Sequence, residues 1–345
     1  MASFAFFDAV TAAQTLAADE FGVIGDTGSL EVAGSDAISS SGSVAVTVHG
    51  RLFGGLSAIH QLDGVLTLTV GETGRVNAGN DDTVFARDVD RAFVSNDGRI
   101  RSLEDALDLR GEGPISILNT GSLLGRSDGI VTASTGSATK IVNDGTITGT
   151  DSGGIDHLGG DFALINHGTI TGEDYGVDAA DIVNDNASSV DEVRNFGSIE
   201  GGVLLYALND IVFNRGEIDV VEMGDGNDIY IGRADGSAGS VDGGGGRDAL
   251  VGSRADDDFT GGLAGDVFVF ARRGGDDRIE DFGGRDRIDL SDFGLSGFSE
   301  LRPLIEDSTG GALIDLSDRG LTILLVDVDK ADLRGSDFIF EVMVS

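Results

Sequence analysis

The sequence predicts an all-β chain in which a right-handed parallel β-helix of about nine rungs continues into a β-roll, after a short N-terminal helical cap. Two internal repeats predict this fold. Glycines recur at intervals of 19 to 29 residues, which is the length of one β-helix rung, at positions 28, 50, 74, 98, 121, 145, 168, 197 and 216. Downstream, aspartates and large apolar residues recur in a nine-residue pattern.

Residues 1–20 are expected to form the helical cap. Phe4, Phe7 and Val10 are spaced as on one face of a helix. We expect this helix to cover the open first rung, because an exposed sheet end invites pairing with another chain.

Residues 21–221 carry the longer repeat and are predicted to form the β-helix. Its clearest copies are the segments 142–149, 165–172 and 194–201, each with an asparagine two residues before the rung glycine. Apolar residues alternate within each rung as in strands, for example Leu164 and Ile170. Stacked side-chain amides can satisfy one another and buried backbone groups. We therefore predict an internal ladder at Asn119, Asn143, Asn166, Asn195 and Asn214.

Residues 222–291 carry the shorter repeat, G-G-x-G-x-D-x-U-x, in which U is large and apolar. Asp248, Asp257 and Asp266 are nine residues apart, and an apolar residue follows each by two positions. The register then slips by two and resumes at Asp277 and Asp286. This phasing disfavours the alternative of a flexible Gly/Asp-rich linker.

The chemistry of the short repeat favours calcium. Glycine turns let backbone carbonyls converge on an ion, and a carboxylate completes the all-oxygen shell that Ca²⁺ prefers. Because one turn has too little core, stacking and ion binding should be coupled. The unit 252–260 lacks the second and third glycines, so it departs furthest from the pattern of a calcium site. The predicted ligand loops of several Ca²⁺ ions contain Gly224, Gly226, Asp228, Gly244, Gly246, Asp248, Asp257, Gly262, Asp266, Gly275, Asp277 and Asp286.

The segment Gly275–Ser291 resembles the end of the repeat block in RTX proteins, the hemolysin-type calcium-binding family. Leu321–Phe340 resembles the flank that follows these repeats in secreted exoproteins. The resemblance implies a Gram-negative bacterial protein exported by a type I secretion apparatus. It also implies that residues 292–345 form a C-terminal capping region with an uncleaved secretion signal.

The composition fits a protein that is soluble in calcium-rich or salty surroundings and is not transmembrane, in line with the export that the resemblance implies. A formal net charge of -37 should repel nucleic acid and anionic membranes and favour cations. The first residues lack the basic lead of a cleaved signal peptide, and no apolar run reaches the 18 or so residues of a membrane span. There is no cysteine, so we expect neither disulfides nor thiolate metal sites.

No catalytic constellation is evident, and we expect no enzyme. Tyr175-Gly-Val-Asp178 resembles the start of a motif of the mannuronan C5-epimerases, but the proline and histidine of that motif are missing. His167 occupies a variable, exposed turn position. Asp156 and Asp178 on neighbouring rungs could still line a groove.

The sequence therefore predicts a secreted, calcium-dependent structural or adhesive protein at the cell surface, in a biofilm matrix, or in a lattice or filament. Its expected partners are calcium, the secretion apparatus, and either further copies of itself or cell-surface glycans. The alternatives are a polysaccharide epimerase or lyase, or a glycan-binding module.

Overall fold

The computed structural model describes residues 2–179, 190–234 and 236–340. The chain divides into two compact units. Unit 1 comprises Met1–Ser189 and Ser198–Gly202, and unit 2 comprises Val190–Gly197 and Val203–Ser345. This division lies earlier in the sequence than the boundary at residue 221 that the repeats predict. Each unit is a parallel β-solenoid, so the predicted all-β helical architecture is confirmed.

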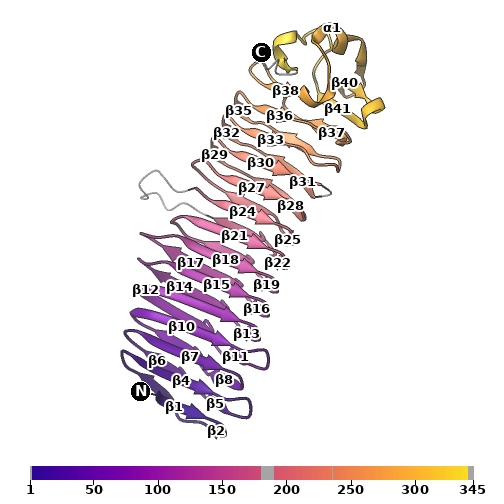
Figure 1. Ribbon diagram of the computed structural model, residues 1–345. Helices are drawn as coiled ribbons and strands as arrows, with labels where there is room; N and C mark the ends of the chain where they lie inside the picture. Colours follow the sequence, from indigo (N-terminus) through magenta and orange to yellow (C-terminus); the bar gives the residue numbers. More distant parts are fainter. Residues whose placement is uncertain (1, 180–189, 235, 341–345) are drawn as a thin grey trace. The chain divides into compact units, whose positions relative to one another are not determined.

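Unit 1 winds through three rows of parallel strands, which are stacked rung upon rung (Figure 1). The first row is β1 (Ala2–Phe6), β4 (Glu20–Ile24), β7 (Val44–Val48), β10 (Gly64–Val70), the second half of β12 (Val84–Asn96), β15 (Ile115–Asn119), β18 (Thr139–Asn143) and β21 (Phe162–Asn166).

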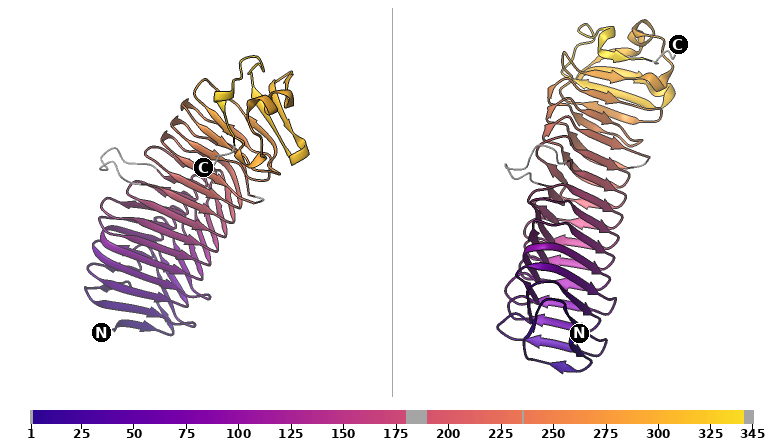
Figure 2. Two further views of the ribbon diagram at one scale, coloured as in Figure 1. Left: turned by 45° about the horizontal axis from the view of Figure 1, so that its top comes forward. Right: turned by 60° about the vertical axis from the view of Figure 1, so that its left-hand side comes forward.

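The second row of unit 1 is β2 (Ala9–Val10), β5 (Ser29–Val32), β8 (Arg51–Gly54), β11 (Arg75–Ala78), β13 (Arg99–Arg101), β16 (Ser122–Gly125), β19 (Thr146–Gly149), β22 (Thr169–Thr171) and β25 (Ser198–Glu200). The third is β3 (Gln14–Leu16), β6 (Ile38–Ser40), β9 (Ile59–Gln61), the first half of β12, β14 (Leu107–Gly111), β17 (Ile130–Ser134), β20 (Ile155–His157) and β23 (Val177–Ala179). The two views of Figure 2 show the same stacking within the unit.

The core of unit 1 consists of in-register aliphatic columns. In the second row each inward residue pairs with its equivalent on the next rung, and all are at most 1% exposed: Leu30, Leu52, Val76, Ile100, Leu123, Ile147, Ile170 and Ile199. Each rung contributes one side chain to a column that no single rung could bury, so the core exists only in the stack.

The N-terminal segment corrects one expectation. The predicted helical cap in residues 1–20 is wrong for the described residues of that range, which form β1, β2, β3 and the start of β4. Ala5 pairs with Val23, and Phe4 is buried against Gly22. The spacing of the apolar residues fits a helix. Pairing with the next rung, however, satisfies the backbone hydrogen bonds and buries Phe4, so tertiary contacts favour the strand over the helix.

Unit 2 has two rows of parallel strands. The first is β24 (Glu192–Asn195), β27 (Ile211–Asn214), β30 (Ile229–Gly232), β33 (Ala249–Val251), β36 (Val267–Val269), β38 (Arg287–Asp289) and β42 (Phe338–Ile339). The second is β26 (Val203–Leu205), β28 (Glu217–Glu222), β31 (Ser237–Asp242), β34 (Asp258–Thr260), β37 (Gly275–Ile279) and β41 (Leu321–Val326). A small parallel sheet of β29 (Asp225–Gly226), β32 (Gly245–Gly246) and β35 (Leu263–Ala264) forms the turns between the rows.

The apolar residues of the nine-residue repeat face the core of unit 2, as predicted. Leu250, Phe268 and Ile288 pair in register in the first row, and Phe259 and Ile279 pair in the second, all 0% exposed. Successive repeats therefore alternate between the two rows, so that the equivalent residue on the same row comes 18 to 20 positions later.

The C-terminal part of unit 2 covers the end of its solenoid. Strand β41 adds to β37 in parallel, and β40 (Gly311–Leu316) pairs antiparallel with both β41 and β39 (Ile305–Ser308). Short helical segments join these strands: η1 (Ser291–Phe293), α1 (Phe298–Leu301), η2 (Arg302–Leu304), η3 (Ser317–Arg319) and η4 (Gly335–Asp337). The four-residue α1 is the one α-helix in the described ranges, and it is too short to span a bilayer. Residues 341–345 of the expected secretion signal lie outside the described residues.

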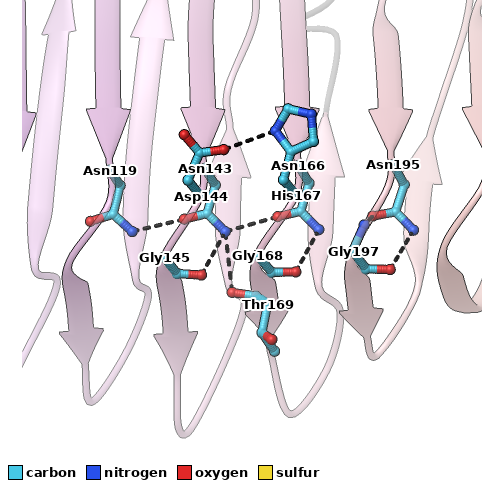
Figure 3. A network of polar contacts seen from close by, with 10 residues as sticks. All are labelled: Asn119, Asn143, Asp144, Gly145, Asn166, His167, Gly168, Thr169, Asn195 and Gly197. Atoms are coloured by element: carbon cyan, nitrogen blue, oxygen red, sulfur yellow. Dashed lines mark hydrogen bonds and ion pairs between the residues drawn. The ribbon is translucent and has the colours of Figure 1, made fainter.

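The predicted asparagine ladder is confirmed within each unit. Figure 3 shows its members Asn119, Asn143 and Asn166 in unit 1. In unit 1, the side-chain amide nitrogens of Asn96, Asn119 and Asn143 each donate to the amide oxygen of the next ladder asparagine, at 2.7, 2.8 and 2.8 Å. In unit 2, Asn195 donates to Asn214 at 3.0 Å. All of these asparagines are 0% exposed.

We predict that Asn143→Ala destabilises unit 1 by about 2 kcal/mol, because Asn119 loses its acceptor and the carbonyls of Gly145 and Thr169 lose a donor in a buried site. The control is Lys140→Ala, which removes an exposed side chain from the same strand and should change the free energy of unfolding by less than about 0.5 kcal/mol. Urea unfolding of the full chain measures both. Equal effects would contradict a stabilising ladder.

Candidate functional site

The aspartates of the short repeat form a second ladder, in unit 2, with a different hydrogen-bond pattern. The backbone N–H of each aspartate donates to the Oδ1 atom of the aspartate one rung further on. The N···O distances are 2.8 Å from Asp228 to Asp248, 2.9 Å from Asp248 to Asp266, and 3.0 Å from Asp266 to Asp286. On the other row Asp257 donates to Asp277 in the same way, at 3.0 Å. The structure therefore brings the six predicted aspartates together in two series, four on one row and two on the other.

The second carboxylate oxygen distinguishes the members of the ladder. The Oδ2 atoms of Asp228, Asp248, Asp266 and Asp277 are buried and have no hydrogen-bond partner among the described residues, and these four aspartates are 1 to 3% exposed. A buried carboxylate oxygen without a donor is costly unless a proton or a cation reaches it. These four oxygen atoms are therefore the feature of the site that fits a metal ion.

Asp257 and Asp286 differ from the other four. Both oxygens of Asp257 accept from Ser253, at 2.7 Å from its backbone and 3.3 Å from its hydroxyl. Asp286 is only half-buried, and its Oδ2 accepts from the backbone of Gly283 at 2.7 Å. Asp257 belongs to the repeat unit that lacks two glycines, and Ser253 stands where the pattern has the second glycine.

The predicted glycines lie in the turns that lead to these aspartates. Positive φ angles occur at Gly224 (87°), Gly244 (85°), Gly246 (134°), Gly262 (94°) and Gly275 (97°), while Gly226 lies in β29 with an ordinary φ. The stacking is close: a Cβ on Gly244 would lie 2.1 Å from the carbonyl oxygen of Gly224. Glycine is needed there for both the backbone conformation and the space between rungs.

The electrostatics of the ladder favour an added positive charge. Burial, together with the neighbouring Asp248, Asp286 and Asp281 carboxylates, raises the pKa of Asp266 to about 7. Burial likewise raises the pKa of Asp228 to about 7, of Asp248 to about 6 and of Asp277 to about 8, and in each case nearby aspartates add to the shift. A carboxyl group that holds its proton near neutral pH releases it when a cation binds.

Sequence reasoning missed the upstream part of this ladder. The backbone N–H of Asp191 donates to Asp210 at 2.9 Å, and that of Asp210 donates to Asp228 at 2.7 Å. Both residues lie in the longer repeat, which has no G-G-x-G-x-D pattern. The detectable signal is the spacing of 18 to 20 residues between ladder aspartates.

Unit 1 contains an acidic cluster that the sequence analysis also missed. Oxygens of Asp82, Asp105 and Asp108 lie within 4.8 Å of one another. Burial first, with neighbouring carboxylates, raises the pKa of Asp82 to about 7 and that of Asp105 to about 6. Arg110 lies 2.5 Å from Asp108 and Arg87 lies 3.7 Å from it, so this cluster already has protein cations.

The histidines take structural positions. His167 is exposed, as predicted, and its Nδ1 lies 2.8 Å from Asp144 (Figure 3). His157 is buried between the hydroxyl of Thr132, 2.9 Å from Nδ1, and the carbonyl of Gly160, 2.8 Å from Nε2. Asp156 and Asp178 are direct register partners on β20 and β23.

Comparisons of the chain with protein-family models, with curated protein sequences and with solved structures gave no match. The function is therefore inferred from the geometry of the two ladders and from the motifs of the sequence.

Ala264 gives a test of the turn geometry that is independent of any ion. It stands where the repeat has its third glycine, and its φ is 93°. We predict that Ala264→Gly stabilises unit 2 by about 1 kcal/mol, because glycine adopts this conformation without strain. The matched control is Ala249→Gly in strand β33, which should destabilise by about 0.5 to 1 kcal/mol. Thermal unfolding measures both, and a loss of stability in Ala264→Gly would contradict the turn geometry.

Proposed function

We propose that this chain is a calcium-dependent β-solenoid that acts outside the cell as a structural or adhesive protein. One observation carries the proposal: buried Oδ2 atoms of aspartates on successive rungs have no hydrogen-bond donor. The residues Asp228, Asp248, Asp266 and Asp277 would hold the ions, and backbone carbonyls of the glycine turns would complete the shells.

The donor set selects the ion. The candidate loops offer carboxylate and carbonyl oxygens, and the chain has no cysteine. Hard cations prefer such ligands, and Ca²⁺ tolerates the irregular, multi-oxygen shells that stacked turns provide better than Mg²⁺ does. A groove of about 640 Å³ beside the ladder is lined by Asp248, Asp266 and Asp286, together with Arg247, Arg285 and Arg287.

Extracellular calcium suits such a protein. Extracellular calcium modules bind with dissociation constants of about 10⁻⁴ to 10⁻³ M, whereas the cytosol holds far less calcium. A chain of net charge -37 would remain under mutual repulsion until ions bind, which favours folding after export. The resemblance to RTX proteins, with their type I secretion, supports this order of events.

We predict opposite effects of Asp266→Asn with and without calcium. Folding raises the pKa of Asp266 from 3.8 to about 7, so its contribution to stability is complete below about pH 4 and is lost as the pH rises through 7. In chelator at pH 8 the variant should therefore be more stable than the wild type, by about 1 to 2 kcal/mol, because the amide carries no charge. In millimolar calcium it should be less stable and bind fewer ions.

Thermal melts at pH 5 and pH 8, each in chelator and in calcium, together with calorimetric calcium titration of the full chain, measure these effects. The control is Asp318→Asn, an exposed residue of η3, which should follow the wild type in every condition. A wild type that gains stability from pH 5 to pH 8 in chelator, or takes up no calcium, would refute the calcium proposal.

The structural role makes a separate prediction. If calcium bridges acidic faces of neighbouring molecules, electron microscopy of the full chain should show ordered filaments or sheets in millimolar calcium and dispersed particles in chelator. Dispersed particles in both conditions would count against self-assembly.

A polysaccharide-acting enzyme is the second candidate. Burial and the charges of Asp128 and Asp178 raise the pKa of Asp156 to about 7, so this carboxyl group could act as an acid or a base near neutral pH. Release of unsaturated uronate would identify a lyase.

A further inference from the structure

Unit 2 carries a row of arginines on a chain that is otherwise strongly acidic. Arg215, Arg233, Arg254 and Arg272 line one groove of about 460 Å³. All four are exposed. None of the described residues that line this groove is acidic, although Asp235, which follows Ala234 in the sequence, lies outside the described residues. This groove is therefore a basic site on a molecule of net charge -37.

The fold aligns these arginines. Each follows a strand of the first row, namely β27, β30, β33 and β36, at the same turn of four successive rungs. Backbone hydrogen bonds fix the turn: the N–H of Arg233 donates to the carbonyl of Asn214 at 2.9 Å, and that of Arg254 to the carbonyl of Ala234 at 3.0 Å. These bonds place Arg233 one rung from Arg215, and Arg254 one rung further on but one position later in the turn than Arg233. Neighbouring strands are about 4.8 Å apart, so the four arginines span roughly 15 Å along the stack.

The four guanidinium groups have no carboxylate partner within 4.0 Å in the described ranges. Elsewhere in the chain, Arg110, Arg126 and Arg278 do form ion pairs. Of the four, Arg272 donates its Nε–H to the backbone carbonyl of Asp292 at 2.9 Å. Like charges on adjacent rungs repel one another, and here they also line a groove, so an anion that enters the groove is attracted by several guanidinium groups at once.

We propose that this groove binds a linear anionic polysaccharide, with one carboxylate or sulfate group for each arginine. A guanidinium presents a planar fork of donors that suits carboxylate and related oxyanions. The repeat of the row is comparable to the length of one sugar in an extended chain. A single small anion would leave most of the row unpaired, whereas a polymer can neutralise all of it.

The aromatic residues favour a polysaccharide over a single-stranded nucleic acid. Phe213 lines the groove, and its ring centroid lies 5.7 Å from that of Phe196, which is 39% exposed. This pair offers one apolar face at the end of the row, on which a sugar ring can pack. Non-specific nucleic-acid sites instead stack successive bases on several aromatic side chains. Next to Arg233 and Arg254, the described residues that line this groove include no aromatic side chain.

Unit 1 provides a matched control row. Arg51, Arg75 and Arg99 are exposed and are direct register partners on β8, β11 and β13. They have the same charge and the same rung spacing as the groove arginines, but they lie on a strand face instead of in the groove. The triple variants R215A/R233A/R254A and R51A/R75A/R99A therefore lose equal charge.

The test measures binding of the full chain in millimolar calcium to heparin, chondroitin sulfate, neutral dextran and a single-stranded oligonucleotide by calorimetry at two salt concentrations. We expect heparin or chondroitin sulfate to bind with salt-dependent affinity, and dextran not to bind. The groove triple should lose affinity by at least about 100-fold, and the control triple should remain within about threefold of the wild type. Circular dichroism and melting temperatures confirm that both variants fold.

Three results would overturn the proposal: equal losses in both triples, no binding of either anionic polysaccharide by the folded wild type, or an oligonucleotide that binds the groove as tightly as they do. Dimers in sedimentation that only the groove triple abolishes would assign the row to a second copy of the chain instead. The site depends on the calcium proposal only in so far as calcium holds unit 2 folded. If the wild type takes up no calcium but is folded and binds the polysaccharide, the calcium proposal fails and the groove stands.

Discussion

In-register parallel pairing is the constraint on which the rest of this structure depends. Because each rung lies directly on the next, a residue at one position of a rung faces its own equivalent on both sides. Aliphatic residues satisfy this arrangement easily, as the column from Leu30 to Ile199 shows. A buried polar residue must instead be satisfied by copies of itself and by the backbone around them.

Asparagine and aspartate meet this constraint with different results. An amide has both a donor and an acceptor, so Asn119 can accept from one neighbour and donate to the next. A carboxylate only accepts, so Asp248 takes one backbone N–H on Oδ1 and leaves Oδ2 without a donor. Inside the asparagine ladder each amide satisfies the next, and only the Oδ1 atom of its first member, Asn96, lacks a donor among the described residues, whereas every rung of the aspartate ladder from Asp228 to Asp266 leaves an Oδ2 atom for a proton or a cation. The same stacking geometry therefore lets asparagines bond to one another, but leaves aspartates with an acceptor atom that no neighbouring aspartate can satisfy.

The stacking of equivalent residues explains which parts of the structure the sequence could predict. Spacing alone located the asparagine ladder and the buried residues Phe259 and Phe268, because a rung repeat forces equivalent residues into one column. Spacing could not show that Ser253 satisfies Asp257, since that depends on the local path of one turn. Spacing also gave the wrong structure for the N-terminal segment. The interval from Phe4 to Phe7 suits a helix, but the segment forms a strand because it pairs with β4.

The same constraint acts on the surface, where it turns one residue choice into a linear array. A charge placed at one turn and repeated on each rung becomes a row of like charges about 4.8 Å apart, which water and salt screen only in part. At one turn of unit 1, the carboxylate of Asp144 lies beside the imidazole of His167 on the next rung. The arginines from Arg215 to Arg254 have no partner of opposite charge among the described residues that line their groove. A row of that kind is best neutralised by a ligand that is itself periodic. A solenoid is therefore suited to linear polymers for the same reason that it can stack asparagines: both depend on the repeat of the rung.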